Sequence, residues 1–399
     1  MGKELELYLH IPFCVKKCAY CDFLSKPADE ETRGRYVDAM VKEIEGCREE
    51  CKDYTVTTVF MGGGTPSILA GREILRIFEA LRRSFSFVPN PEMTIEANPG
   101  TVTEEKLDAW REAGINRLSI GLQSTSDTEL RLLGRIHTYG DFLDTYHLAR
   151  RRGFDNINVD LISAIPGQSV ASWERTLKRT ADLEPEHISA YSLIIEEGTC
   201  FYEWYQDGDS KEKGKCALRL PPLPDEETDR RIYRKTKEIL EERGYFRYEI
   251  SNYAKKGYAC RHNLGYWERK EYLGIGLGAS SLMQEQRFHN TCDLSSYLEL
   301  LNKERKSPGE NQCALLREEL ESLSVQEQME EFFFLGLRKT QGVSGNEFLR
   351  LFGRSMDEVY GEKIRKLSAD GLLIRQEDRL RLTEYGVDVS NYVFGELLL

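Results

Sequence analysis

The chain has 399 residues and a net charge of −12, from 55 lysines and arginines against 67 aspartates and glutamates. This length allows two or three domains, or one large barrel with an appendage. The most apolar run, residues 332–337, is far shorter than the roughly 18 residues of a membrane span. The acidic balance argues against a protein that mainly binds nucleic acid. The early acids Glu4 and Glu6 leave no apolar stretch for a signal peptide. We therefore expect a cytoplasmic protein with no transmembrane segment and no nucleic-acid partner.

Short apolar, β-branched runs alternate with longer amphipathic stretches from residue 5 to about residue 195. The predicted strands are residues 5–11, 56–61, 93–97, 117–122, 157–162 and 188–193. The predicted helices are residues 30–50, 72–85, 103–113, 139–152 and 170–182. Strands separated by helices form parallel sheets, because a parallel partner needs a crossover connection. The α/β pattern therefore predicts a partial (β/α)6, TIM-like barrel. A doubly wound sheet is the alternative.

The regular alternation ends after residue 195. Residues 208–224 read as a linker or insertion, and a long charged helix is expected over about 225–243. Residues 324–399 follow the order helix, turn, helix, helix, hairpin, which is typical of a small winged-helix-like α+β domain. This segment has 10 lysines and arginines against 13 acids, so we expect it to pack or bind a partner rather than read DNA. The predicted domains are a barrel core (1–200), a barrel extension (201–310) and the C-terminal domain (311–399).

Three cysteines, Cys14, Cys18 and Cys21, form a CxxxCxxC cluster just after the first predicted strand. Their soft thiolates favour zinc or an iron–sulfur cluster. A structural zinc site normally has a fourth cysteine or histidine nearby, and none follows at regular spacing. A [4Fe–4S] cluster held by three cysteines leaves one iron open for a small ligand. Buried structural cysteines and zinc are the weaker alternatives.

With its position after the first strand of a six-unit barrel, this cluster resembles that of the radical S-adenosylmethionine (SAM) superfamily. The resemblance implies a [4Fe–4S] cluster whose open iron binds the amino and carboxylate groups of SAM. It also implies reductive cleavage of SAM to a 5′-deoxyadenosyl radical inside a closed barrel that excludes water.

Further polar and glycine residues follow the other predicted strands, at the end where such barrels place their sites. Glycines in the run from Gly62 to Gly64 let the backbone approach a ligand, and their free N–H groups can hold its amino or carboxylate group. Glu96, at the end of the third strand, is a candidate hydrogen-bond partner for SAM. Asp160 lies within an apolar strand and needs a partner. Arg135 and bound SAM are the two candidates.

Within the superfamily, several motifs are similar to those of the oxygen-independent coproporphyrinogen III oxidases and their relatives. These motifs are YxHIPFC from residue 8, GGGTP from residue 62, GxQS from residue 121 and DLI from residue 160. Carried over from that group, the expected SAM contacts are Tyr8, Gly63, Gly64, Thr65, Glu96, Gln123, Arg135 and Asp160. The oxidases have a fourth cysteine two residues after the third. Here Asp22 and Phe23 follow Cys21, which argues against the oxidase reaction.

Two segments instead resemble the sibling group, the HemW-type haem chaperones: residues 190–199 and the HNxxYW motif at 262–267. An imidazole is a good axial ligand to haem iron and aromatic rings pack on porphyrin, so His262 is the expected haem ligand, ahead of Cys260. The resemblance implies a chaperone that binds haem and passes it to acceptor haemoproteins of the respiratory chain. A homodimer is the assembly that we consider. The alternative is an oxygen-independent coproporphyrinogen III oxidase. A redox-sensing nucleic-acid binder is the least favoured hypothesis.

Overall fold

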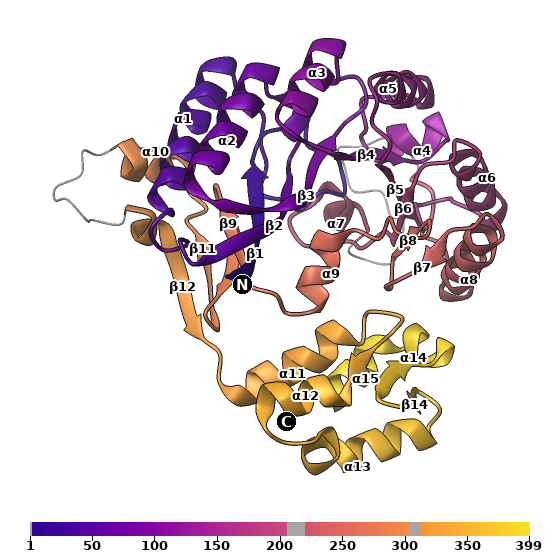
Figure 1. Ribbon diagram of the computed structural model, residues 1–399. Coiled ribbons are helices and arrows are strands. Elements are labelled where there is room, and N and C mark those ends of the chain that lie inside the picture. Colours follow the sequence, from indigo (N-terminus) through magenta and orange to yellow (C-terminus); the bar gives the residue numbers. More distant parts are fainter. Residues whose placement is uncertain (1, 206–219, 303–311) are drawn as a thin grey trace.

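Six parallel strands stand side by side in chain order in the computed structural model, which describes residues 2–205, 220–302 and 312–399 (Figure 1). They are β1 (Lys3–Ile11), β2 (Tyr54–Gly63), β3 (Ser86–Ala97), β4 (Arg117–Gln123), β5 (Ile157–Ser163) and β6 (His187–Ser192). A doubly wound sheet would reverse its strand order at one point, and this sheet runs from β1 to β6 without reversal. The predicted barrel-type arrangement is therefore confirmed.

Helices cover the outer face of these strands (Figure 1). They are α1 (Glu30–Gly46), η1 (Pro66–Ile68), α2 (Gly71–Ser84), α3 (Glu104–Glu112), α4 (Asp127–Leu132), α5 (Tyr139–Arg151) and α6 (Val170–Ala181). Side-chain caps start several of them. Asp29, for example, accepts the backbone N–H of Thr32 at 2.8 Å. The short α4 was not predicted, because six residues carry too little periodicity to be recognised.

The two faces of the barrel strands differ in polarity. On β1, Leu5, Leu7 and Leu9 are fully buried in the apolar core, which the outer helices complete. Because side chains alternate along a strand, Glu6 and Tyr8 between them point into the barrel. The same alternation repeats on the following strands, so the barrel interior is largely polar.

Further strands extend the sheet beyond both ends of the parallel set, to twelve strands with edges at β12 and β7. Beside β1 stand β9 (Tyr272–Ile275), β10 (Ser280–Met283), β11 (Gln286–Asn290) and β12 (Arg317–Ser322). Beside β6 stand β8 (Asn252–Ala254) and β7 (Phe246–Arg247). The sheet order does not return to β1 after β6, so the barrel is partly open, as predicted.

The extension also supplies helices α7 (Cys200–Tyr205), α8 (Glu226–Glu242), α9 (Arg261–Trp267), α10 (Leu294–Asn302) and η2 (Gln312–Leu316). Helix α8 matches the long charged helix expected over 225–243. Of the predicted linker at 208–224, residues 208–219 lie outside the described residues.

The C-terminal part has its own apolar core, centred on Phe333, Phe348 and Tyr360. Its elements are α11 (Val325–Gly336), β13 (Val343–Ser344), α12 (Gly345–Phe352), α13 (Met356–Ala369), β14 (Leu373–Gln376), β15 (Arg379–Leu382), α14 (Glu384–Asp388) and α15 (Ser390–Glu396). The predicted order of helix, turn, helix, helix and hairpin is present from α11 to β15, whereas β13 and the last two helices, α14 and α15, were not predicted. It contacts the barrel where the Arg338 guanidinium lies 5.1 Å from the ring of Trp267, at the end of α9. The domain boundaries at 200 and 310 stay predictions.

The described residues include no helix that is both long and apolar enough to span a membrane.

Candidate functional site

The cysteine loop follows β1 and is closed at its base by backbone hydrogen bonds. Cys14 N–H donates to the Lys26 carbonyl at 3.2 Å, and Lys26 N–H donates to the Pro12 carbonyl at 3.0 Å. His10 Nε2 donates to the carbonyl of Leu24 at 2.9 Å. These bonds hold residues 12–26 as a loop at the carboxyl end of β1, where the three cysteines face one cavity.

That cavity has a volume of about 510 Å³ and lies at the carboxyl ends of the barrel strands. Its lining includes all three cluster cysteines together with seven of the predicted SAM contacts: Gly63, Gly64, Thr65, Glu96, Gln123, Arg135 and Asp160. Residues from six separate strands and loops thus meet in one place. Which of them contact SAM stays a prediction.

Tyr8 is the predicted SAM contact that does not line the cavity. Its hydroxyl donates to His10 Nδ1 at 3.1 Å, and its ring stacks on Phe60 inside the barrel. In this position Tyr8 orients His10, which in turn holds the cysteine loop.

The chemistry of the three thiols suits an iron–sulfur cluster. Burial raises the pKa of the Cys14 and Cys21 thiols, so bound iron must displace their protons. Among the described residues, no group of three metal-binding side chains is placed to hold a single metal ion.

The glycine run at the carboxyl end of β2 allows close packing. A Cβ on Gly64 would meet the Phe13 carbonyl oxygen at 2.6 Å, and one on Gly63 would meet the His10 ring at 2.7 Å. The N–H of Gly63 donates to Glu96 Oε2 at 3.1 Å, and that of Gly64 donates to the Ile11 carbonyl at 2.8 Å. The prediction that these N–H groups are free for a ligand was therefore wrong. The glycines bring β2 against the cysteine loop.

Two half-buried carboxyl groups, those of Glu96 and Asp160, line the cavity close enough for the charge of one to act on the other. Burial, and secondly the nearby Asp160, raise the pKa of Glu96 to about 8, so Glu96 is mostly protonated at neutral pH. Burial also raises the pKa of Asp160, but Ser119 and Asn158 donate hydrogen bonds to it at 2.8 and 2.9 Å. The pair therefore has different roles available: Glu96 can donate or accept a hydrogen bond, whereas Asp160 is held as an acceptor.

Arg135 is not the partner of Asp160, contrary to one of the two candidates above. Its Nη2 donates to Asn98 Oδ1 at 2.7 Å and to the Gly121 carbonyl at 2.6 Å. Its Nη1 lies 3.8 Å from the sulfur of Cys18. The guanidinium therefore adds positive charge beside a thiol that would be a thiolate in a cluster.

Asn98 and Ser119 also line the cavity and were missed as site residues. Asn98 Nδ2 donates to Thr65 Oγ1 at 2.7 Å, so it joins two predicted contacts, Thr65 and Arg135. Ser119 lies two residues before Gly121 on β4. The alternation of side chains along a strand places both on the inner face, and this signal identifies Ser119.

His262 lies at the other end of the barrel, on α9, and only 1% of its surface is exposed. Its Nδ1 bonds to Thr58 Oγ1 at 2.7 Å and its Nε2 to the Tyr266 hydroxyl at 3.0 Å. Its ring stacks on Phe60 at 5.3 Å between centroids. Burial lowers its pKa to about 3, so the imidazole is neutral. In this conformation both ring nitrogens are occupied, and iron ligation by His262 stays a prediction that requires one of these bonds to break.

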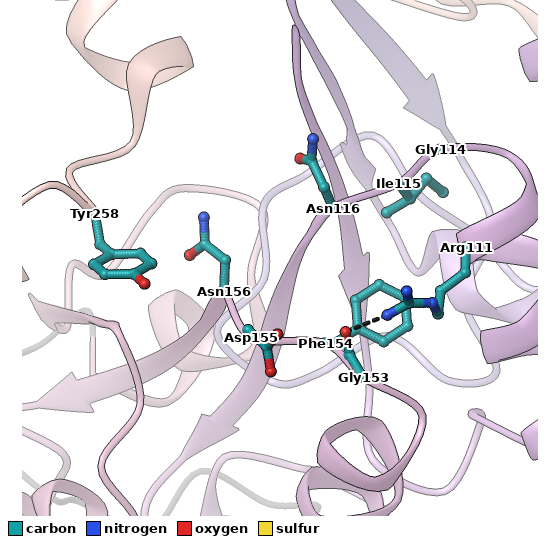
Figure 2. A pocket seen from close by; sticks show the side chains of 9 residues that line it. All are labelled: Arg111, Gly114, Ile115, Asn116, Gly153, Phe154, Asp155, Asn156 and Tyr258. Atoms are coloured by element: carbon teal, nitrogen blue, oxygen red, sulfur yellow. Dashed lines mark hydrogen bonds between the residues drawn. The ribbon is translucent and has the colours of Figure 1, made fainter. Parts of the chain in front are cut away.

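A second cavity, of about 370 Å³, lies at the amino ends of β4 and β5 (Figure 2). None of the predicted site residues lines it. Arg111 at its edge donates to the Gly153 carbonyl, and Tyr258, from the segment before α9, stands across from Asn156 (Figure 2). The predicted residues thus gather at the carboxyl-end cavity and at α9.

Comparison with known proteins defines the class of this chain. The profile described as "Radical SAM superfamily" matches residues 8–180, and the profile "HemN C-terminal domain" matches residues 323–389. The structure of the coproporphyrinogen III oxidase HemN of Escherichia coli superimposes with a TM-score of 0.83, covering 100% of this chain and 90% of that one. At 23% identity, this likeness concerns the fold alone. The chain is a radical SAM protein, which supports a [4Fe–4S] cluster and SAM as its cofactors.

Full-length relatives narrow the family. "Heme chaperone HemW" of Bacillus subtilis is 35% identical over 397 residues, covering 98% of both chains. The HemW of Escherichia coli is 32% identical, covering 96% of this chain and 95% of its own. The mitochondrial "Radical S-adenosyl methionine domain-containing protein 1" of Bos taurus is 32% identical over 417 residues. The chain belongs to the HemW family.

Proposed function

We propose that this chain is a haem chaperone, which binds haem and delivers it to acceptor haemoproteins, on a radical SAM scaffold with a [4Fe–4S] cluster and SAM. The observation that carries the proposal is the similarity over nearly the whole chain to proteins named haem chaperones. The residues after Cys21 agree with it, because Asp22 and Phe23 stand where the oxidases have their fourth cysteine.

In this proposal Cys14, Cys18 and Cys21 hold the cluster, and the cavity beside them takes SAM. When bound, the cluster would supply an electron, and SAM would supply the sulfonium that this electron can cleave. The chain's own part is to set the charge beside Cys18 through Arg135 and to present Glu96 and Asp160 as hydrogen-bonding groups. The rest of the cavity wall is formed by Gly63, Gly64, Thr65 and Gln123. Tyr8 lies outside the cavity and orients His10, which holds the cysteine loop.

The proposed haem ligand is His262. Haem binding then requires α9 to move far enough to free one ring nitrogen from Thr58 or Tyr266. We expect His262→Ala to weaken haem binding and change the Soret band while the cluster spectrum stays the same. His289→Ala, on β11 outside the barrel interior, is the matched control. An unchanged haem spectrum in His262→Ala would move the ligand elsewhere, with Cys260 the next residue to test.

The proposed partners are haem and respiratory haemoproteins, with a homodimer as the proposed assembly. The proposed location is the cytoplasm, and no nucleic-acid partner is proposed. The acidic C-terminal unit is then a packing or partner module.

The alternative function is that of an oxygen-independent coproporphyrinogen III oxidase, and the fold likeness to HemN is the observation in its favour. A haem titration of anaerobically purified protein, with a parallel coproporphyrinogen III assay in the presence of SAM and reductant, separates the two. Stoichiometric haem binding without turnover is the expected result. Turnover of the porphyrinogen with weak haem binding would contradict the chaperone proposal.

A further inference from the structure

Polar side chains fill the barrel between the SAM cavity and α9, and several of them form a continuous chain of hydrogen bonds. This series of hydrogen bonds begins at the start of α9, where the backbone N–H of Cys260 donates to the hydroxyl of Tyr248 at 3.3 Å. The Tyr248 hydroxyl lies 2.8 Å from Nε2 of His187, on β6. Nδ1 of His187 lies 2.6 Å from Oδ1 of Asn158, on the neighbouring β5. His187 is fully buried.

The series of hydrogen bonds ends on the carboxylate of Asp160, which lines the SAM cavity. Asn158 Nδ2 donates to Asp160 Oδ1 at 2.9 Å and to Ser119 Oγ at 2.7 Å. The Ser119 hydroxyl donates in turn to Asp160 Oδ2 at 2.8 Å. Both carboxylate oxygens therefore receive a hydrogen bond from this network.

The donors in this network all point the same way. Because the amide nitrogen of Asn158 donates to Asp160 and Ser119, its oxygen must accept, and Nδ1 of His187 must carry the proton. Nε2 of His187 is then unprotonated and accepts from the Tyr248 hydroxyl, whose oxygen accepts from Cys260 N–H. Each bond polarises the next, so a chain directed at a carboxylate strengthens every bond along it. Burial also lowers the pKa of His187 far below its usual range, which keeps the ring neutral, and its hydrogen bonds then place the proton on Nδ1.

We infer that His187 is a positioning residue of the SAM pocket: acting through Asn158, it fixes the orientation and negative charge of Asp160, and Tyr248 fixes His187. The inference rests on the SAM site of the proposed function and is independent of haem delivery. Without the N–H of His187, only the Ser189 hydroxyl, at 3.1 Å, still donates to Asn158 Oδ1, so the Asn158 amide is held less firmly and can turn its oxygen toward Asp160. The carboxylate would then lose a donor and face an acceptor.

The test compares two substitutions of His187 by their affinity for SAM, measured by calorimetric titration of cluster-loaded protein. Glutamine can donate to Asn158 and accept from Tyr248, whereas leucine can do neither. We expect His187→Leu to bind SAM about tenfold more weakly, the equivalent of one lost hydrogen bond to a charged group. We expect His187→Gln to recover most of that loss. The iron content and cluster spectrum of each variant serve as the check that the cluster is intact.

Tyr248→Phe is a milder variant that removes one hydroxyl and keeps the ring. We expect it to weaken SAM binding about threefold, since it acts one bond further from Asp160. Tyr146→Phe is the control, because the buried Tyr146 hydroxyl donates to the Leu183 carbonyl in the outer layer, away from this chain. It should leave SAM affinity unchanged.

Wild-type SAM affinity in His187→Leu would overturn the inference. So would equal losses in His187→Leu and His187→Gln, because that result means that ring packing matters and donor direction does not. Loss of SAM affinity in Tyr146→Phe as large as in Tyr248→Phe would overturn it as well. Wild-type protein that binds SAM but no haem would contradict the chaperone proposal and leave this inference standing.

Discussion

The two ends of the barrel interior differ in where their polar groups find partners. At the carboxyl end, the cysteines, Glu96 and Arg135 border an open cavity of about 510 Å³. At the amino end, α9 fills the space, and His262 and its neighbours bond to one another. The first end is built to receive a ligand as it stands, whereas the second must open before it can bind one. A shared radical SAM scaffold can thus hold its cofactors at one end and a second, closed element at the other.

Removal of one cluster ligand should have the largest effect at the carboxyl end of the barrel. We expect Cys18→Ala to lose the [4Fe–4S] cluster completely, because the loop supplies three thiolates and the proposed cluster needs all of them. Iron content and the cluster's optical spectrum are the measurements. Cys200→Ser, which removes an exposed thiol that does not line the cavity, should keep the cluster. A full cluster in Cys18→Ala would mean that the ligands lie elsewhere.

The closed end should make stability depend on pH through Glu6. Burial raises the pKa of Glu6 to about 8, against a model-peptide value of 4.5. Between these values the folded protein holds a proton that the unfolded chain has lost, so stability falls as pH rises. We expect Glu6→Gln to gain about 1 kcal/mol per pH unit over the wild type between pH 5 and 8. Chemical denaturation across this range measures it, and parallel curves for the two proteins would contradict the burial argument.

Gly265 tests how tightly α9 is seated. A Cβ at this position would lie 2.1 Å from Glu6 Oε1, deep in the interior. We expect Gly265→Ala to lower the free energy of unfolding by about 2 kcal/mol through overpacking. Gly34→Ala is the control, because nothing lies within 4 Å of its Cβ and alanine favours helix α1. Equal stability of Gly265→Ala and the wild type would mean that α9 is already loosely held.

The affinity of the carboxyl-end cavity for SAM should depend on pH through Glu96. With a pKa of about 8, Glu96 is mostly neutral at pH 7, and the positive charge of SAM favours its ionised form. SAM binding should then release a proton, and affinity should rise by up to about tenfold from pH 7 to pH 9. Calorimetric titrations in buffers of different ionisation enthalpy measure both effects. Glu96→Gln should show neither, and a flat wild-type profile would contradict this role of Glu96.

Much of the barrel could be predicted from local pattern. Apolar runs predicted the positions of β1, β2, β4, β5 and β6 within two residues, since buried parallel strands have a strong composition signal. Strand β3 begins at Ser86, seven residues before the predicted start at residue 93, and its first half was missed because it contains two prolines. The cavity residues followed because the carboxyl ends of parallel strands meet at one edge of the sheet.

Other features depend on contacts between residues far apart in the sequence. The true partners of Asp160 and the bonded N–H groups of Gly63 and Gly64 follow from strand register and loop closure, which composition does not encode. The burial of His262 follows from α9 entering the barrel, where Thr58 lies 204 residues earlier in the chain. A motif alone therefore predicted that His262 matters, and only the fold shows that it is enclosed.

Transfer of haem from this chain to an acceptor is the most direct test of a chaperone function. Protein loaded with haem is mixed with a haem-free respiratory haemoprotein at several concentrations, and the haem spectrum and acceptor activity are followed over time. A haem chaperone should release haem at a rate that rises with acceptor concentration, and acceptor activity should be restored. A rate independent of the acceptor, or haem that stays bound, would contradict a chaperone function.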